Sequence, residues 1–273
     1  MNLEVMIKKY TEINYTYEDA SSKVCQDILL LKISKSVFSK HITIKGGVVI
    51  HSISKDIRRA TRDIDLDFIK YSLDDNSIIN FINELNNIND GIKISTIGPI
   101  KKLHHQDYDG KRVSIKLTDE FGYDIYTKLD IGIHKNFDIE QEEYCFCFDI
   151  IDKTANLLIN SKEQILTEKL KSLLKLGFRT TRYKDLFDFY YLINIAGIDK
   201  QKLYNCFDVL IFKNNEMREN NLIDILSRLR QIFSSSRYYN MLNEPKINWL
   251  DIPVNKVIDN VLNYFDSLDN IEV

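Results

Sequence analysis

The chain has 273 residues, of which 44% are hydrophobic and 28% are charged. This composition supports one large or two modest globular domains, and it excludes a disordered or a fibrous protein. The formal net charge of −3 is too close to neutral for a protein that binds nucleic acid through its overall charge. Any nucleic-acid partner must therefore contact a local basic surface.

Neither membrane nor export signals are visible. No apolar run reaches the roughly 18 residues that a membrane span needs, and the N-terminal segment lacks the apolar core of a signal peptide. We therefore expect a cytoplasmic protein with no membrane partner. The four cysteines lack metal-binding spacing, so we expect free, buried thiols at Cys25, Cys145, Cys147 and Cys206.

The first third of the chain predicts alternating helices and strands. Apolar residues three to four positions apart predict an amphipathic helix over residues 18–38. A short strand at residues 41–45 runs into a glycine pair. The alternation of acidic and apolar residues over 62–69 predicts a strand with one buried face. Residues 74–87 then have the pattern of a helix.

The middle of the chain is rich in strand patterns. Three follow one another between residues 92 and 134, linked by segments with the Asp and Gly of tight turns, so we expect an antiparallel meander. Residues 144–150 predict one more strand, after which helical periodicity takes over. We therefore expect an α+β protein with a mixed-sheet domain at residues 1–152 and a helical domain at residues 153–273.

Three carboxylates alternate along the second predicted strand. Asp63, Asp65 and Asp67 are two positions apart, so they project from one face while the apolar residues between them point into the core. Mg²⁺ often binds one or two such carboxylates together with substrate phosphates. The alternative is an edge strand whose acids face solvent. A calcium-binding EF-hand loop is excluded, because Phe68 and Asp74 stand where it needs Gly and Glu.

Two further features accompany these acids. Gly46 and Gly47 lie between a strand and a predicted helix, where backbone N–H groups can approach a phosphate. Any tight turn can use such a pair, so it does not by itself indicate phosphate binding. Asp130 lies on the polar face of a later strand. A glycine turn, an acidic pair and a distant third acid follow the order found in nucleotidyltransferases, whose metal ions clamp the attacking and leaving oxygens at phosphorus.

The helical half contains a second candidate cluster. Lys169 falls within the apolar stripe of the helix predicted at residues 163–177, where a lysine must either extend its ammonium to solvent or meet an anion. Asp185 and Asp188 share one face of the next helix, and Lys169 and Arg182 are their candidate partners. Both a structural salt bridge and a role in a site fit this pattern.

These motifs occur in a defined order, at residues 45–47 (KGG), 59–66 (RATRDIDL), 108–113 (YDGKRV), 128–131 (KLDI), 163–170 (EQILTEKL) and 181–188 (TRYKDLFD). Together they resemble the AbiEii/AbiGii family of abortive-infection nucleotidyltransferase toxins. The resemblance implies a polymerase-beta-like nucleotidyltransferase domain joined to a helical domain, acting as the toxin of a bacterial type IV toxin–antitoxin system. It also implies Mg²⁺ as cofactor and an NTP as donor.

The resemblance assigns roles to individual residues. It implies metal binding by Asp63, Asp65 and Asp130, and nucleotide binding by Gly46, Gly47, Lys128, Lys169 and Arg182. The implied catalytic residues are Asp63, Asp65, Asp130, Lys169 and Asp185. We expect Asp130 to orient or deprotonate the attacking hydroxyl, Lys169 to neutralise phosphate charge and Asp185 to position Lys169. Many nucleotidyltransferases have Ser where Gly47 stands, so one hydroxyl contact to the triphosphate is missing.

The expected partners are the NTP, an RNA acceptor such as a tRNA 3′ end, and a cognate antitoxin encoded nearby, with or without direct binding. Basic residues for RNA occur in two stretches, at residues 162–184 and 101–116. Two alternatives remain open. The enzyme could modify a protein or a small molecule, or the chain could be a non-catalytic module that only binds nucleotide.

Overall fold

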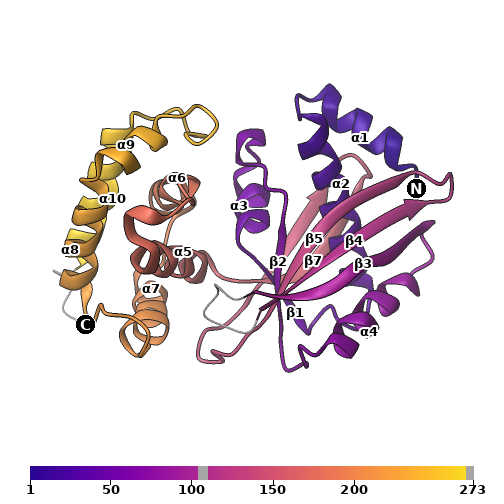
Figure 1. Ribbon diagram of the computed structural model, residues 1–273, viewed down its shortest axis with the longest axis horizontal. Coiled ribbons are helices and arrows are strands. Elements are labelled where there is room, and N and C mark those ends of the chain that lie inside the picture. The colour runs from indigo at the N-terminus through magenta and orange to yellow at the C-terminus, as the bar shows by residue number, and fades with distance from the viewer. Residues whose placement is uncertain (104–109, 269–273) are drawn as a thin grey trace. The chain divides into compact units, whose positions relative to one another are not determined.

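The computed structural model describes residues 1–103 and 110–268 (Figure 1). The chain forms two compact units, Met1–Asn160 and Ser161–Val273. The division lies at residue 160 rather than at the expected 152, because Lys153–Ile159 forms strand β7, not the start of the helical part. Strand β7 pairs with β1 on one side and β6 on the other. Such non-local pairing overrides a weak local pattern.

The first unit contains a seven-stranded mixed sheet in the order β3-β4-β5-β2-β1-β7-β6. Its strands are β1 (Ile42–Lys45), β2 (Ile64–Phe68), β3 (Ile92–Leu103), β4 (Gly110–Asp119), β5 (Asp124–Ile133), β6 (Glu142–Phe148) and β7 (Lys153–Ile159). The predicted antiparallel meander is confirmed as β3–β4–β5. The pairs β2–β5 and β1–β7 are parallel, so the sheet is mixed. The expected α+β class is therefore confirmed.

Helices cover one face of this sheet. They include α1 (Leu3–Glu12), α2 (Tyr17–Lys35) and α4 (Asp75–Asn86), while α3 (Gly47–Ser54) follows β1 directly. Helix α2 contacts β5 and β7, and α4 contacts β3. The Lys32 ammonium on α2 donates to the Leu85 carbonyl on α4, which places both helices on the same face. The opposite face of the β3–β5 meander has alternate polar side chains, most of them half-buried or exposed, although Asp130 is buried.

Strand β2 is central in the sheet, with three strands on each side. The alternative of a solvent-facing edge strand for the alternating acids is therefore wrong. Ile64, Leu66 and Phe68 are fully buried, as the alternation predicts. A carboxylate on a central strand cannot be explained as protection of a sheet edge.

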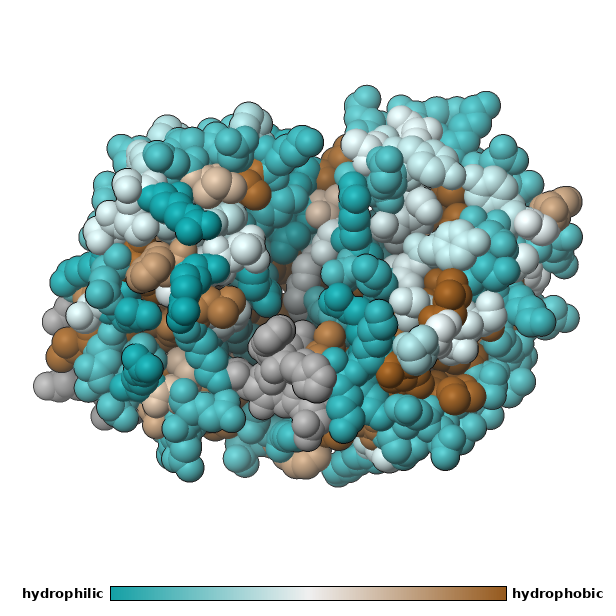
Figure 2. Space-filling model, in the orientation of Figure 1, coloured by the Kyte–Doolittle hydropathy of each residue, from teal (hydrophilic) through white to brown (hydrophobic). Residues whose placement is uncertain are grey.

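The second unit is helical. Its helices are α5 (Lys162–Leu176), α6 (Lys184–Tyr191), α7 (Lys200–Phe207), α8 (Leu222–Phe233), α9 (Ser236–Leu242) and α10 (Val254–Leu268). Trp249, Tyr238 and Phe187 are among the large side chains buried in its core. Within residues 1–103 and 110–268, no helix combines the length and apolar character that crossing a membrane requires. Most of the surface visible in Figure 2 is hydrophilic, with hydrophobic residues in small groups.

The expectation of four buried thiols was half wrong. All four cysteines are free, and Cys25 and Cys206 are buried, but Cys145 and Cys147 are exposed. The exposed pair occupies alternate positions on β6, an edge strand of the sheet, so both side chains project from the same outer face. Burial raises the pKa of the Cys25 thiol well above its usual range.

Candidate active site

Four charged side chains form a row across the middle of the sheet. Lys45 on β1 is paired in register with Asp65 on β2, Asp65 with Asp130 on β5, and Asp130 with Arg112 on β4. Side chains in register on neighbouring strands project from the same face, about 5 Å apart. The row thus places two carboxylates side by side between two cations, and it confirms that Asp65 and Asp130 come together.

Arg112 holds Asp130 through both carboxylate oxygens. The guanidinium Nε donates to Oδ1 and Nη2 to Oδ2, each at 2.6 Å. Nη2 also lies 3.9 Å from Oδ2 of Asp63, whose side chain is 51% exposed. The hydrogen bonds to Asp130 raise the pKa of Arg112 above its ordinary value. The guanidinium is therefore a cation that Asp63 and Asp130 share.

The third acid of the predicted ladder has a different role. The Lys45 ammonium lies 2.7 Å from Oδ1 of Asp67, and both side chains are nearly buried. This ion pair neutralises Asp67 on the same face as Asp65. Of the three acids, Asp67 is therefore held in a nearly buried ion pair, whereas the Asp63 side chain is 51% exposed.

The glycine turn lies against Asp65. Gly46 has a φ of +67°, and a Cβ added to it would lie 2.7 Å from Oδ2 of Asp65. Helix α3 begins at the next residue without a side-chain cap, so its first N–H groups are available to a negatively charged group. A Cβ on Gly47 would lie 2.8 Å from Oγ1 of Thr61. The space that a serine would fill at Gly47 is therefore occupied by another hydroxyl, that of Thr61.

Replacing Gly46 with Ala is expected to lower at least tenfold the nucleotide transfer that the family resemblance implies, because the methyl group must displace the Asp65 carboxylate. The positive φ adds roughly 1–2 kcal/mol of backbone strain. Gly122→Ala is the matched control, since Gly122 also has a positive φ of +81° but open space around its Cβ position. Transfer rates and melting temperatures of both variants separate the clash from the strain. Equal activity losses in the two variants would contradict a role for the Gly46–Asp65 contact.

The carboxylates suit a hard cation whose remaining coordination positions are filled by oxygens of a substrate. In the described part of the chain, no three His, Cys, Asp or Glu side chains are gathered closely enough to form a metal-binding group. Asp63 and Asp65 nevertheless offer the one or two carboxylates with which Mg²⁺ commonly joins a nucleotide's phosphates. Each oxygen of Asp130 already accepts one hydrogen bond from Arg112, so a cation bound there would compete with the guanidinium for the same carboxylate.

Arg112→Ala is expected to destabilise the metal-free protein by roughly 2 kcal/mol, because Asp130 is left with neighbouring acids and no cation. Mg²⁺ should raise the melting temperature of this variant more than that of the wild type. Thermal melts with and without Mg²⁺ provide the measurement, and Arg112→Lys is the control that keeps the charge. If Mg²⁺ shifted neither protein, the assignment of this row as a cation site would fail.

The predicted cluster of the helical unit is also formed. The Lys169 ammonium on α5 lies 2.5 Å from Oδ1 of Asp185 and 3.0 Å from Oδ2 of Asp188, both on α6. Arg182 Nε donates to the other Asp185 oxygen at 2.9 Å. Lys169 is 4% exposed and Asp188 is fully buried. The ammonium therefore meets anions, and the alternative in which it extends to solvent is wrong.

Other residues of this unit differ from the helical-wheel expectation. At 100° per residue Lys171 lies outside the apolar stripe of α5 and Leu176 lies within it, yet Lys171 is 9% exposed and Leu176 is 44% exposed. Leu176 is the last residue of α5, and a helical wheel does not predict burial there because the chain leaves the helix. The wheel placed Lys169 correctly, but it failed for Lys171 in the same part of the helix.

Two residues of the site were missed from the sequence. Arg112 belongs to the YDGKRV motif, of which residues 108 and 109 lie outside the described residues, and its partner Asp130 is 18 residues away. Thr61 belongs to the RATRDIDL motif. A signal for Arg112 was available in the sequence. The predicted meander puts this arginine on the strand next to Asp130, and an arginine beside a lone acid indicates an ion pair. Lys128, predicted to bind nucleotide, is exposed on this face opposite Ser114.

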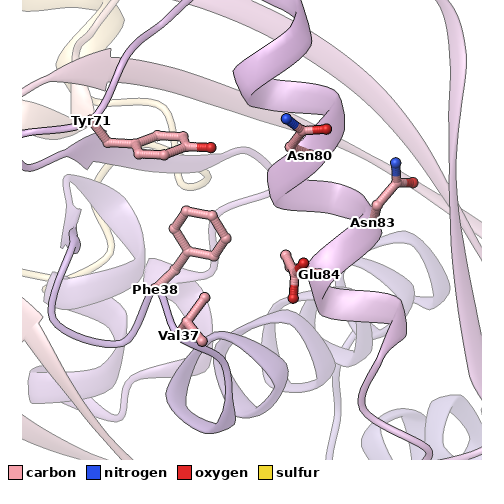
Figure 3. A pocket seen from close by; sticks show the side chains of 6 residues that line it. All are labelled: Val37, Phe38, Tyr71, Asn80, Asn83 and Glu84. Atoms are coloured by element: carbon pink, nitrogen blue, oxygen red, sulfur yellow. The ribbon is translucent and has the colours of Figure 1, made fainter.

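A pocket elsewhere in the first unit lacks these residues. It has a volume of about 530 Å³ and is lined by Val37, Phe38, Tyr71, Asn80, Asn83 and Glu84. Figure 3 shows Phe38 between Val37 and Tyr71, with the other three side chains on helix α4. The Phe38 and Tyr71 rings pack edge to face. The pocket brings together no acid–base pair that could perform phosphoryl chemistry.

A mixed sheet in which paired acids lie beside a glycine turn agrees with the nucleotidyltransferase-like arrangement expected from the motifs. The family model described as "Nucleotidyl transferase AbiEii toxin, Type IV TA system" matches residues 28–254. The match covers most of both units, and the chain belongs to this family. The resemblance inferred from the motifs is therefore confirmed.

Other comparisons add little. A comparison with curated protein sequences finds no match. One similar solved structure is an antigenic nucleotidyltransferase-like protein from Paracoccidioides brasiliensis, with 14% sequence identity and a TM-score of 0.43. The alignment covers 88% of this chain and 92% of that one.

Proposed function

We propose that the protein is a Mg²⁺-dependent toxin that transfers NMP from an NTP to an acceptor hydroxyl, most fittingly the 3′ end of a tRNA or another RNA. The observation that carries the proposal is the Asp65–Asp130 register pair beside Gly46. Acids and cations lie side by side on one face of the central sheet, and helix α3, which has no side-chain cap, begins next to Asp65. This combination suits the binding and cleavage of a triphosphate.

Each residue contributes a defined interaction. Asp63 and Asp65 would hold Mg²⁺, which supplies charge neutralisation at the phosphorus and at the leaving oxygen. The N–H groups that begin helix α3 bind a phosphate of the NTP, and the Thr61 hydroxyl supplies the contact absent at Gly47. Asp130 accepts the proton of the attacking hydroxyl once Arg112 releases one carboxylate oxygen. The acceptor oxygen then bonds to the α-phosphorus as pyrophosphate leaves.

The helical unit contributes a buried ion-pair cluster. Asp185 positions the Lys169 ammonium, and Asp188 binds the same ammonium from a fully buried position. Because Lys169 is 4% exposed and pairs with both acids, we propose that it orders this cluster, while Arg182, whose side chain is 51% exposed, keeps the phosphate-binding role that the family resemblance implies.

The family also bears on the partner and the compartment of the protein in the cell. A toxin of this family implies a cognate antitoxin, and we propose that the protein acts in the cytoplasm, where NTPs and tRNA occur. An antitoxin that binds directly would lower transfer in a purified mixture, whereas one acting on gene expression would not. Adding the purified antitoxin to the transfer reaction distinguishes the two.

The acceptor is identified by incubating the protein with Mg²⁺, each α-labelled NTP in turn, and total bacterial RNA or a bacterial extract. Labelled tRNA is the expected product. Label in protein or in a small molecule would replace RNA as the acceptor. A protein that binds NTP but transfers no label to any fraction would be a non-catalytic nucleotide-binding module, which contradicts the proposal.

A further inference from the structure

The face of the sheet that carries the acidic row continues as an open surface over β3, β4 and β5. Register pairs place Lys93, Lys101, Arg112, Lys116, Lys128 and Tyr126 on this face. The opposite face of the same strands is core, with Val113, Ile115 and Leu117 almost fully buried. We call this open surface the meander face.

The meander face is basic. Among the described residues of β3–β5, the side chains on this face include five cations, against the carboxylates of Asp124 and Asp130 only. Asp130 is held by Arg112, and Asp124 lies 3.1 Å from the Lys116 ammonium. Lys93, Lys101 and Lys128 are exposed. A chain with a net charge of −3 therefore concentrates positive charge beside its acidic row.

An exposed aromatic ring lies among these cations. Tyr126 on β5 is 60% exposed and is paired in register with Lys116, while Lys128 is two positions further along the same face. Tyr126 and Asp130 are four residues apart on one strand, a distance of about 13 Å at 3.3 Å per residue. A short single strand of nucleic acid could span this distance while its end reached Asp130.

We infer that the meander face binds the single-stranded 3′ end of an RNA acceptor, with an unpaired base stacked on Tyr126 and phosphates near Lys128. The inference rests on the proposed transfer to a hydroxyl at Asp130. Single-stranded nucleic acids bind where cations follow the backbone and an accessible ring stacks on a base. An acidic protein would use the cations without needing the ring.

The basic residues of the helical unit fit this role less well. Lys169 is held by Asp185 and Asp188. The Lys162 ammonium donates to the Ala196 carbonyl, and Lys175 pairs with Glu216. Cations that already have acidic or carbonyl partners release little energy when they meet a phosphate. The meander face has exposed lysines directly beside the row that carries the chemistry.

The test is the binding of a fluorescein-labelled single-stranded RNA oligonucleotide, measured by anisotropy with the whole protein and no NTP. Tyr126→Ala is expected to weaken binding about tenfold, and Tyr126→Phe to keep it, because stacking needs the ring and not the hydroxyl. Lys128→Ala should reduce the dependence of affinity on salt. The matched control is Phe121→Ala, since Phe121 is 73% exposed in the turn between β4 and β5.

Each outcome decides the inference. Wild-type affinity in Tyr126→Ala, or equally tight binding of a blunt RNA duplex, would overturn it. Binding of polyglutamate as tight as that of RNA, unaffected by Tyr126→Ala, would assign the face to an acidic protein. RNA binding that depends on Tyr126, in a protein that transfers no nucleotide, would support the face and contradict the proposed function. Transfer to RNA that ignores Tyr126 would do the reverse.

Discussion

Asp65→Asn is expected to lower nucleotide transfer roughly a thousandfold or more while the protein still folds, because a metal-binding charge supplies several kcal/mol of transition-state stabilisation. Asp65 lies on the central strand, beside Asp130 and against Gly46. Asparagine keeps its shape but removes the charge. Asp63→Asn should have a comparable effect, since Asp63 is the second acid of the pair.

The control for this prediction is Asp124→Asn on the same face of the sheet. Asp124 is held by Lys116 and Thr118, toward the far end of β5. This variant should transfer nucleotide at close to the wild-type rate. Transfer is measured with α-labelled NTP, and folding by circular dichroism and the melting temperature. An Asp65→Asn protein that transferred label as the wild type does would remove the acidic pair from the mechanism.

Lys169→Met is expected to lower the free energy of unfolding by about 3–5 kcal/mol, because it removes the cation of a buried cluster and leaves its acids behind. Asp188 is fully buried and Asp185 is 7% exposed. Lys175→Met is the control, since the Glu216 partner of Lys175 is largely exposed and such surface pairs contribute about 1 kcal/mol or less. Urea denaturation of the two variants provides the comparison.

A double variant separates stability from chemistry. Lys169→Met with Asp188→Asn removes the ammonium together with one buried charge, so part of the lost stability should return. If transfer returned with stability, the cluster would be purely structural. If transfer stayed low in a protein of restored stability, Lys169 would contribute to the reaction. A single Lys169→Met variant as stable as the wild type would contradict the buried ion-pair account.

Local patterns in the sequence predicted most of the fold. The alternation around β2 and the periodicity of α2 and α5 depend on residues close together in the chain. They could therefore be recognised without knowing which strands and helices pack against these elements. Strand β7 was missed because its weak pattern is decided by β1 and β6 on either side. The boundary between the units moved for the same reason.

For the candidate site, the sequence pattern located individual acids but not the contacts that they make in the sheet. Asp65 and Asp130 were recognised as acids on polar strand faces, yet their adjacency depends on the parallel register of β2 and β5. The Arg112 clamp depends on a second register, between β4 and β5. Register is set by packing of the whole sheet and not by local spacing. The hydrogen bonds from Arg112 to Asp130 could therefore not be predicted from local sequence patterns.

The central claim is that the acidic row performs NMP transfer, and parallel reactions with α-labelled and γ-labelled NTP test it most directly. With Mg²⁺ and RNA, the wild type should incorporate the α-label into RNA and release the γ-label in pyrophosphate. The Asp65→Asn variant should do neither. Incorporation of the γ-label, or α-label transfer that persists in Asp65→Asn, would contradict the account.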